Sequence, residues 1–225
     1  MKNVDYINWA KYILDIAEDY INSESSILEL AAGNCKMAEI ISDKYPEYIA
    51  TDLNLPMLKS FEKKIVTRIC CDMSELPFNK KNDFIFSAFD SVNYILTQKK
   101  LIKFFREVCF VLSNNGIFTF DVSLEKNSTK YDIPNMVEDH HNGFHYQRIN
   151  RYNKRNQIHY NTFILTDNDG RNTKEVHKQK IYDIMTYFKL AEKAGLHIVA
   201  CYDCFTFNDL KADSERAQFV MRKVK

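Results

Sequence analysis

Glycine is scarce in this chain, with 5 among 225 residues. The first strand-like run, ILELAAGNC at 27–35, has one glycine, Gly33. The loop with three glycines that many nucleotide sites use is therefore missing. Long apolar runs are also missing, which argues against a membrane-spanning helix. Charge of one sign is not in excess, because the net charge is +1. Nothing therefore attracts the whole molecule to nucleic acid or to a membrane surface.

The cysteines do not form a metal-binding pattern. The chain has six, including the adjacent pair Cys70 and Cys71. It opens with the polar stretch MKNVDYIN instead of a signal peptide, so we expect reduced thiols in a cytoplasmic protein. Cys201 and Cys204 form a lone C-x-x-C with no second ligand pair. We interpret them as strand residues and predict no metal site.

The chain does contain a regular alternation of short apolar runs and helical patterns. Its 225 residues predict one domain with a sizeable core. Strand–helix alternation indicates a parallel sheet covered by helices on both faces. We predict helices at 3–21, 35–45, 56–64, 98–112 and 182–194, and strands at 26–30, 48–53, 67–71, 83–89, 116–122, 197–205 and 216–223. Asn114–Gly116 are expected to stop the helix at 98–112, and the last two strands to form an antiparallel hairpin.

The alternation breaks at residues 123–180, where we find no convincing helix. The sequence there is typical of antiparallel strands, with turns at 153–156 and 168–170. A segment this long is too large for a plain connection. We therefore predict an α/β fold with a doubly wound, mostly parallel seven-stranded sheet in a single domain, 1–225. The antiparallel insertion at about 123–180 is expected to act as a lid or substrate subdomain.

Three successive strands end in residues that suit a nucleoside. Ligands of doubly wound sheets bind outside the carboxyl ends of the strands. After the first strand, the small residues 31–33 allow backbone N–H groups to approach a ligand closely. Asp52 ends the second strand, where a carboxylate can accept both hydroxyls of a ribose. After the third strand, Asp72 and the N–H of Met73 can bind an adenine. Together these positions predict a nucleoside-containing cofactor.

On these residues the chain resembles the class I S-adenosylmethionine-dependent methyltransferases over essentially its whole length. Their glycine-rich loop matches LELAAGNC at 28–35, and their ribose-binding and adenine-binding acids match Asp52 and Asp72. Their reversed seventh strand matches the terminal hairpin. The resemblance implies an enzyme whose cofactor is S-adenosylmethionine. It also implies the cofactor-binding residues, which are Trp9, Glu29, Ala31, Gly33, Asp52, Leu53, Asp72, Met73, Ala88 and Phe89.

Within that class, AFDSVNYI at 88–95 and DYINWAKYI at 5–13 resemble segments of small-molecule enzymes such as glycine N-methyltransferase and aminosugar N,N-dimethyltransferases. The resemblance implies that Trp9 lies against the cofactor and that Tyr94 faces the transferred methyl group. A tyrosine is a poor base at neutral pH. We therefore predict that Tyr94 positions the acceptor, with Asn93 and Asp90 as polar neighbours. The alternative is that Tyr94 packs in the core.

Three features depart from the family pattern. Ala31 and Cys35 replace the first and third loop glycines, Tyr94 replaces a histidine found in several relatives, and a tyrosine-containing segment that precedes the first helix in relatives is missing. The site is then more open, or it is covered by residues 123–180. That insertion also carries histidines for which strand residues, metal ligands or a base all remain open: His140, His141, His145, His159 and His177.

We predict transfer of a methyl group to nitrogen or oxygen of a small-molecule acceptor, with no membrane partner. Two alternatives stay open: a protein that binds the cofactor without catalysis, and a nucleic-acid methyltransferase, for which the basic, aromatic stretch 147–160 argues. The balanced charge and the missing N-P-P-[YF] motif argue against nucleic acid. An NAD-dependent oxidoreductase ranks behind, because its fingerprint needs glycine at Lys36. A homodimer formed through the insertion is a further expectation.

Overall fold

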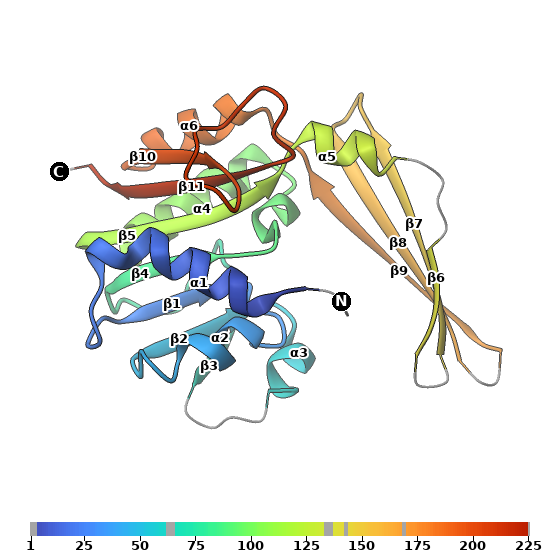
Figure 1. The fold of residues 1–225 in the computed structure, drawn as a ribbon, viewed down its shortest axis with the longest axis horizontal. Coiled ribbons are helices and arrows are strands. Elements are labelled where there is room, and N and C mark those ends of the chain that lie inside the picture. Colours follow the sequence, from blue (N-terminus) through green and yellow to red (C-terminus); the bar gives the residue numbers. More distant parts are fainter. Residues whose placement is uncertain (1–3, 62–65, 133–136, 142–143, 168–169, 225) are drawn as a thin grey trace.

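The structure is a computed structural model that describes residues 4–61, 66–132, 137–141, 144–167 and 170–224; for 137–141, 144 and 145 it describes the backbone alone. Within these residues the chain forms a seven-stranded sheet, here called sheet A, and a four-stranded sheet, here called sheet B (Figure 1). The predicted α/β fold with an antiparallel insertion is therefore confirmed.

Sheet A has the strand order β10-β11-β5-β4-β1-β2-β3. The strands from β1 to β5 are parallel, and β11 runs antiparallel to both β5 and β10, as the predicted terminal hairpin requires. The strands are β1 (Ile27–Leu30), β2 (Tyr48–Asp52), β3 (Thr67–Cys70), β4 (Asn82–Ser87), β5 (Leu112–Ser123), β10 (Leu196–Asp203) and β11 (Arg216–Lys223).

Helices cover both faces of sheet A (Figure 1). They are α1 (Tyr6–Ala17), α2 (Lys36–Ile41), α3 (Leu55–Lys59), α4 (Gln98–Val111) and α6 (Ile184–Lys193). Neighbouring strand residues point to opposite faces, so Ile27 packs in the cluster under α1 and α2, and Leu28 packs in the cluster with α4 and α6. A strand covered on both sides reads as a continuous apolar run. In the described residues, no helix combines the length and the hydropathy needed to span a bilayer.

Several boundaries differ from the prediction. Helix α2 ends at Ile41 and not at 45, α3 ends at Lys59, and residues 62–64 of the third predicted helix lie outside the described residues. The first helix ends at Ala17, and a turn of 3-10 helix, η1 (Glu18–Tyr20), follows. Strand β5 begins at Leu112, directly after α4, so Asn114–Gly116 lie inside the strand where its register with β4 shifts. A Cβ atom on Gly116 would lie 2.9 Å from the carbonyl oxygen of Asp83, so this glycine is needed for a close approach of two backbones.

Sheet B is antiparallel and stands beside the carboxyl ends of the parallel strands (Figure 1). Its strands are β6 (Val137–His141), β7 (Phe144–Asn153), β8 (Ile158–Thr166) and β9 (Asn172–Lys180). A turn at 154–157 joins β7 to β8, close to the predicted position. Residues 168 and 169 of the second predicted turn lie outside the described residues. The prediction missed the short helix α5 (Glu125–Lys130), which precedes sheet B.

Asn93 fastens sheet B to the core. It lies in the 3-10 helix η2 (Ser91–Tyr94), and its side chain is fully buried. Its Nδ2 donates to the carbonyl oxygens of Ser123, at 3.2 Å, and Lys180, at 2.9 Å, and its Oδ1 accepts from the N–H of Ser123 at 2.9 Å. One amide therefore joins the end of β5 to the end of β9. We predicted Asn93 as a polar neighbour of Tyr94 at the acceptor; its side chain is instead buried and links the two sheets as a clasp.

Candidate active site

The loop after β1 forms the first part of the site. Ala31, Gly33 and Cys35 all have left-handed backbones, with φ of 57°, 57° and 60°. Such a conformation costs a residue with a side chain about 1–2 kcal/mol. Ala31 and Cys35 thus adopt, at the cost of backbone strain, the left-handed conformation that glycine adopts without strain. Cys35 is buried, and burial, together with the nearby Glu29 carboxyl, raises the pKa of its thiol to about 12. The thiol therefore stays protonated and is no nucleophile at neutral pH.

Asp52, at the end of β2, holds this loop in place. Its Oδ2 accepts from the N–H of Gly33 at 2.7 Å, and its Oδ1 accepts from the N–H of Asn54 at 2.7 Å. A carboxylate has about four acceptor sites, so each oxygen can take a second donor. Two adjacent hydroxyls of a ribose fit this arrangement. Beside it, the Leu53 side chain is 70% exposed and offers an apolar surface to a flat ring.

Glu29 lies beneath the surface of the site. Its side chain is 3% exposed, and its Oε2 accepts from the hydroxyl of Tyr48 at 2.7 Å. Burial raises the pKa of Glu29 to about 8, against the hydrogen bond from Tyr48, which lowers it. At neutral pH this carboxyl is therefore largely protonated. Through this hydrogen bond the buried Glu29 supports the pairing of β1 with β2.

Asp72 follows β3, next to the end of β2. Its Oδ1 accepts from the N–H and the hydroxyl of Ser74 at 2.9 Å and 2.8 Å, and its Oδ2 pairs with Nζ of Lys100 at 2.7 Å. Partial burial disfavours the charge, but the hydrogen bonds from Lys100 and Ser74 win and lower the pKa of Asp72. An ionised acceptor is thus kept at the predicted adenine position. Met73, the next residue, is half-buried and packs on the core cluster of α4.

The segment after β4 brings three predicted cofactor residues together. Ala88 is buried, and Phe89 and Asp90 have left-handed backbones with φ of 61° and 49°. The ring of Phe89 lies 4.5 Å from the ring of Trp9 on α1, measured between centroids. Strained backbone of this kind persists only where the surroundings enforce it, and it gathers at functional sites.

An ion network that the sequence analysis missed enforces this turn. Arg216, at the start of β11, contacts the carboxylate of Asp121 and lies 3.2 Å from Oδ2 of Asp90. The N–H of Asp90 donates to Oδ2 of Asp121 at 2.8 Å. Burial raises the pKa of Asp121 to about 6, although Arg216 opposes the shift. The guanidinium also lies 5.9 Å from the ring centroid of Trp9. The ion network therefore extends to one of the residues predicted to bind the cofactor.

Tyr94 faces sheet B. Its side chain is 46% exposed, so the alternative that it packs in the core is wrong. Its hydroxyl lies 3.3 Å from Nδ1 of His177 on β9. Protein still surrounds the phenol closely enough that partial burial, together with the charge of Asp90, raises its pKa to about 12. Tyr94 therefore remains a neutral phenol at physiological pH and stands between the two sheets.

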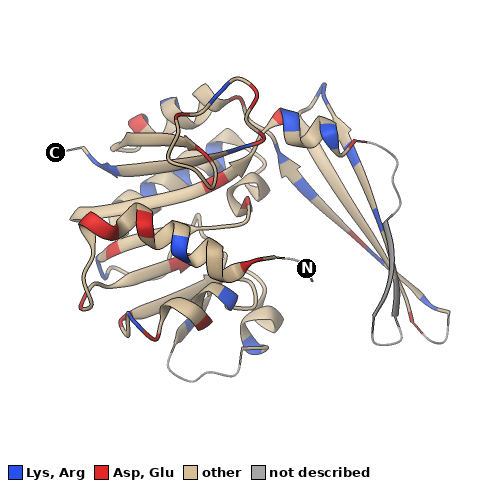
Figure 2. Cartoon of the chain, in the orientation of Figure 1, with Lys and Arg blue, Asp and Glu red and all other residues tan. Residues whose placement is uncertain are grey.

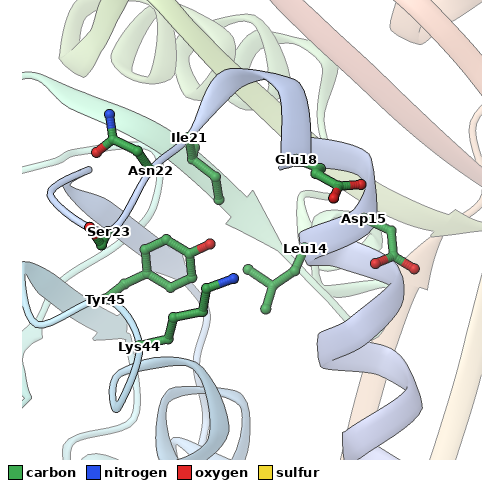
Figure 3. Close-up of a pocket in the computed structure, with 8 residues that line it drawn as sticks. All are labelled: Leu14, Asp15, Glu18, Ile21, Asn22, Ser23, Lys44 and Tyr45. Atoms are coloured by element: carbon green, nitrogen blue, oxygen red, sulfur yellow. The ribbon is translucent and has the colours of Figure 1, made fainter.

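A surface pocket lies at the opposite, amino edge of sheet A. Figure 3 shows Lys44 extended along Tyr45 on one side and Leu14 of α1 on the other, and the ammonium of Lys44 is 5.3 Å from the Tyr45 ring centroid. The pocket is lined by Leu14, Asp15, Glu18, Ile21, Asn22, Ser23, Lys44 and Tyr45. It contains none of the residues predicted to bind the cofactor, and ligands of parallel sheets bind at the other edge.

Known proteins share both the sequence pattern and the fold. Residues 27–116 match the family model described as a methyltransferase domain. A curated relative, the putative methyltransferase YqeM of Bacillus subtilis (strain 168), is 25% identical over 234 residues, covering 100% of this chain and 93% of the relative. A solved S-adenosylmethionine-dependent methyltransferase from Clostridium acetobutylicum ATCC 824 is 24% identical with a TM-score of 0.86, covering 100% of this chain and 94% of that one.

A second solved structure, CalS10 from Micromonospora echinaspora, is described as an amino pentose methyltransferase with S-adenosylmethionine bound. It is 15% identical with a TM-score of 0.72, covering 98% of this chain and 90% of that one. The family match spans the loop after β1, Asp52 and Asp72, and the fold is shared over nearly the whole chain. The chain therefore contains a segment that matches a methyltransferase domain and shares the fold of solved S-adenosylmethionine-dependent methyltransferases. Its cofactor is S-adenosylmethionine, and the acceptor capacity left at Asp52 fits the ribose.

Proposed function

We propose that this enzyme methylates a nitrogen or oxygen atom of a small, polar acceptor that binds between the segment after β4 and sheet B. S-adenosylmethionine supplies a methyl group that its sulfonium already activates. The protein must then mainly hold the acceptor in line with that methyl group, because alignment alone can remove a large part of the barrier. We further propose that the insertion is the substrate subdomain of a single-domain enzyme. We also propose that the residues implied by the resemblance bind the cofactor, with Glu29 supporting the loop from beneath and not contacting the cofactor directly.

The polar face of sheet B is the observation that carries this proposal. Residues paired directly across strands share a face, and the register joins Asn150 to Asn161, Asn161 to His177, and His159 to Gln179. Because His177 contacts Tyr94, this is the face directed at the core. Asn150, His159, Asn161 and Gln179 are buried, each between 6% and 8% exposed.

A face that served only to pack sheet B on the core would be apolar, since burying polar groups is costly. These side chains instead hydrogen-bond among themselves. Nη2 of Arg148 donates to Asn161 at 2.7 Å, and Nδ2 of Asn161 donates to Gln179 at 3.2 Å. Nδ1 of His159 is buried and has no hydrogen-bond partner among the described residues. Such a surface suits a hydroxylated or aminated ligand, and the similarly folded CalS10 is described as an amino pentose methyltransferase.

The alternative of a nucleic-acid substrate is less well supported. Figure 2 shows basic residues along β7 and β9. By register, however, Arg151, Tyr160 and Lys178 share the face that points away from Tyr94. A phosphate backbone bound there would lie on the far side of sheet B from the methyl group.

Transfer of a labelled methyl group tests the proposal. The enzyme is incubated with methyl-labelled S-adenosylmethionine and, separately, a metabolite extract, a panel of amino sugars and total RNA. Label in a small molecule is the expected result. Asp52→Ala should lower it about tenfold or more at limiting cofactor, while Asp15→Ala, in the amino-edge pocket, should not. Label in RNA alone would establish the nucleic-acid alternative. Cofactor binding by calorimetry without any labelled product would establish a binding protein that lacks catalysis.

A further inference from the structure

We infer that Tyr94 and His177 act together as the group that takes the acceptor's proton, with Tyr94 touching the acceptor and His177 receiving the proton behind it. The inference deepens the proposed function and rests on it. It assigns a chemical role to a residue of the insertion for which the sequence left several roles open. It also restricts the acceptor to one whose nucleophile carries a removable proton, an alcohol or an ammonium group.

The pair joins the two sheets. Tyr94 follows β4, and His177 lies on β9, with the rings edge to face at 6.0 Å between centroids. The hydroxyl of Tyr94 is 3.3 Å from Nδ1 of His177, and Nε2 of His177 is 3.5 Å from Oε2 of Glu175. The ring of Phe163 packs against the imidazole from β8 at 5.4 Å. The imidazole is thus held between a phenol, a carboxylate and a ring.

The proposed role requires one arrangement of the protons at these contacts. The phenol of Tyr94 donates its hydrogen to Nδ1 of His177, and the neutral imidazole carries its hydrogen on Nε2, facing Glu175. Glu175 then stabilises the imidazolium once it forms, and it fixes the tautomer that leaves Nδ1 free to accept.

Tyr94 does not act as a base on its own. Partial burial and the charge of Asp90 raise its pKa to about 12, so an isolated phenolate at this place is unfavourable. A phenol that passes its own hydrogen to His177 as it receives another never needs to carry a full negative charge. Several of the resembling enzymes have a histidine at the position of Tyr94, so their imidazole contacts the acceptor directly. In this chain the imidazole of His177 lies behind Tyr94 and reaches the acceptor through the phenol.

The proposed step conserves protons and electron pairs. The acceptor's O–H or N–H hydrogen goes to the oxygen of Tyr94, and the hydrogen of Tyr94 goes to Nδ1 of His177. The acceptor's electron pair forms the new bond to the methyl carbon, and the electron pair of the breaking C–S bond returns to sulfur, which becomes a neutral thioether. The imidazolium loses its proton to solvent, which reaches it because the side chain of His177 is 38% exposed.

The pH dependence follows from the groups around the pair. Oε2 of Glu175 on β9 lies 3.5 Å from Nε2 of His177, Arg148 on β7 lies over the ring of Phe163, and Asp90 raises the pKa of Tyr94. Because a protonated imidazole cannot accept a hydrogen, methyl transfer should require the neutral form of His177. An ammonium acceptor reaches the site already deprotonated at high pH, so its need for the pair should vanish there, whereas an alcohol acceptor should need the pair at every pH.

His177→Gln and Tyr94→Phe test this with the acceptor found by the labelling assay. Proton transfer to a side chain contributes typically 10²–10⁴-fold, so we expect kcat of His177→Gln at neutral pH to fall by about 100-fold. With an ammonium acceptor the loss should shrink as the pH rises, and with either kind of acceptor added imidazole should partly restore His177→Gly. Cofactor affinity by calorimetry should stay constant. The matched control is His197→Gln, an exposed histidine on β10, which should behave like the parent.

An acceptor-free measurement separates this inference from the proposed function. In ¹⁵N-histidine NMR spectra with S-adenosylhomocysteine bound, Tyr94→Phe should move the Nδ1 signal of His177 and leave that of His197 unchanged. An unmoved signal overturns the pair whether or not an acceptor is known. A His177→Gln variant whose pH–rate profile equals that of the parent overturns the proton role while methyl transfer itself stands. Absence of any methylated product overturns the proposed function, and the inference with it.

Discussion

At the scale of single residues, Asp52 does two things at once. It accepts two backbone N–H groups that shape the loop, and we propose that its remaining acceptor sites bind the ribose. A hydrogen bond to a charged group contributes about 1.5–3 kcal/mol, so Asp52→Ala should weaken cofactor binding tenfold or more. Calorimetry with S-adenosylmethionine measures this, with the exposed Asp15→Ala as the control. Equal affinity in Asp52→Ala and the parent would remove Asp52 from the cofactor site.

Glu29 gives the molecule a pH-dependent stability. Burial raises its pKa to about 8 in the folded protein, whereas a glutamate in an unfolded chain titrates near 4.3. Between about pH 5 and pH 8 the folded state keeps a proton that the unfolded state releases. The contribution of Glu29 to the free energy of unfolding is therefore complete in acid. It is lost as the pH rises through 8, by up to about 1.4 kcal/mol per pH unit.

Glu29→Gln cannot release this proton, so its free energy of unfolding should vary less between pH 5 and pH 8 than that of the parent. Urea unfolding at a series of pH values measures the slope, which stays informative even if the substitution changes stability at every pH. Glu24→Gln, on an exposed turn before β1, is the control. A slope equal to that of the parent would mean that Glu29 is ionised in the folded protein.

At the scale of elements, the turn after β4 depends on the opposite end of the chain. Arg216→Met leaves Asp121 buried without its cation, and breaking a buried pair costs about 3–5 kcal/mol. We expect the free energy of unfolding to fall by that order in urea titrations, and Asp121→Asn added to Arg216→Met to recover part of it. Arg222 lies on the same strand and donates to the backbone carbonyl of Asn115 at 3.4 Å. As the control, Arg222→Met should change stability little. Equal losses in the two arginine variants would mean that the network does not support the turn.

The difference between local patterns and contacts of distant residues explains how much of the structure the sequence predicts. The parallel strands could be placed because a strand buried on both faces is a continuous apolar run, as in ILEL, and Asp52 and Asp72 then follow from the rule on strand ends. The Arg216–Asp121 contact joins residues 95 apart, and the Tyr94–His177 contact joins residues 83 apart. No local period carries such pairings. The clasp made by Asn93 was missed for the same reason, since its partners end two distant strands.

At the scale of the whole molecule, the clasp makes the insertion separable. Both Ser123 and Lys180 bond the amide of Asn93, at 3.2 Å and 2.9 Å, so the ends of the inserted segment lie close together. We therefore expect a variant in which a short glycine–serine linker replaces residues 125–179 to fold, because sheet A, its helices and both core clusters are built from residues outside this segment.

This variant should bind S-adenosylmethionine with nearly the affinity of the parent, because none of the residues assigned to the cofactor lies in the deleted segment. Methyl transfer to the acceptor should fall to background, since the polar face of sheet B and His177 are removed. Circular dichroism, calorimetry and the labelling assay give the three measurements. Replacing only Lys154 and Arg155 in the exposed β7–β8 turn by glycines is the matched control and should preserve all three. A folded deletion variant that no longer binds the cofactor would mean that sheet B covers the cofactor itself, and the acceptor would then need another place to bind.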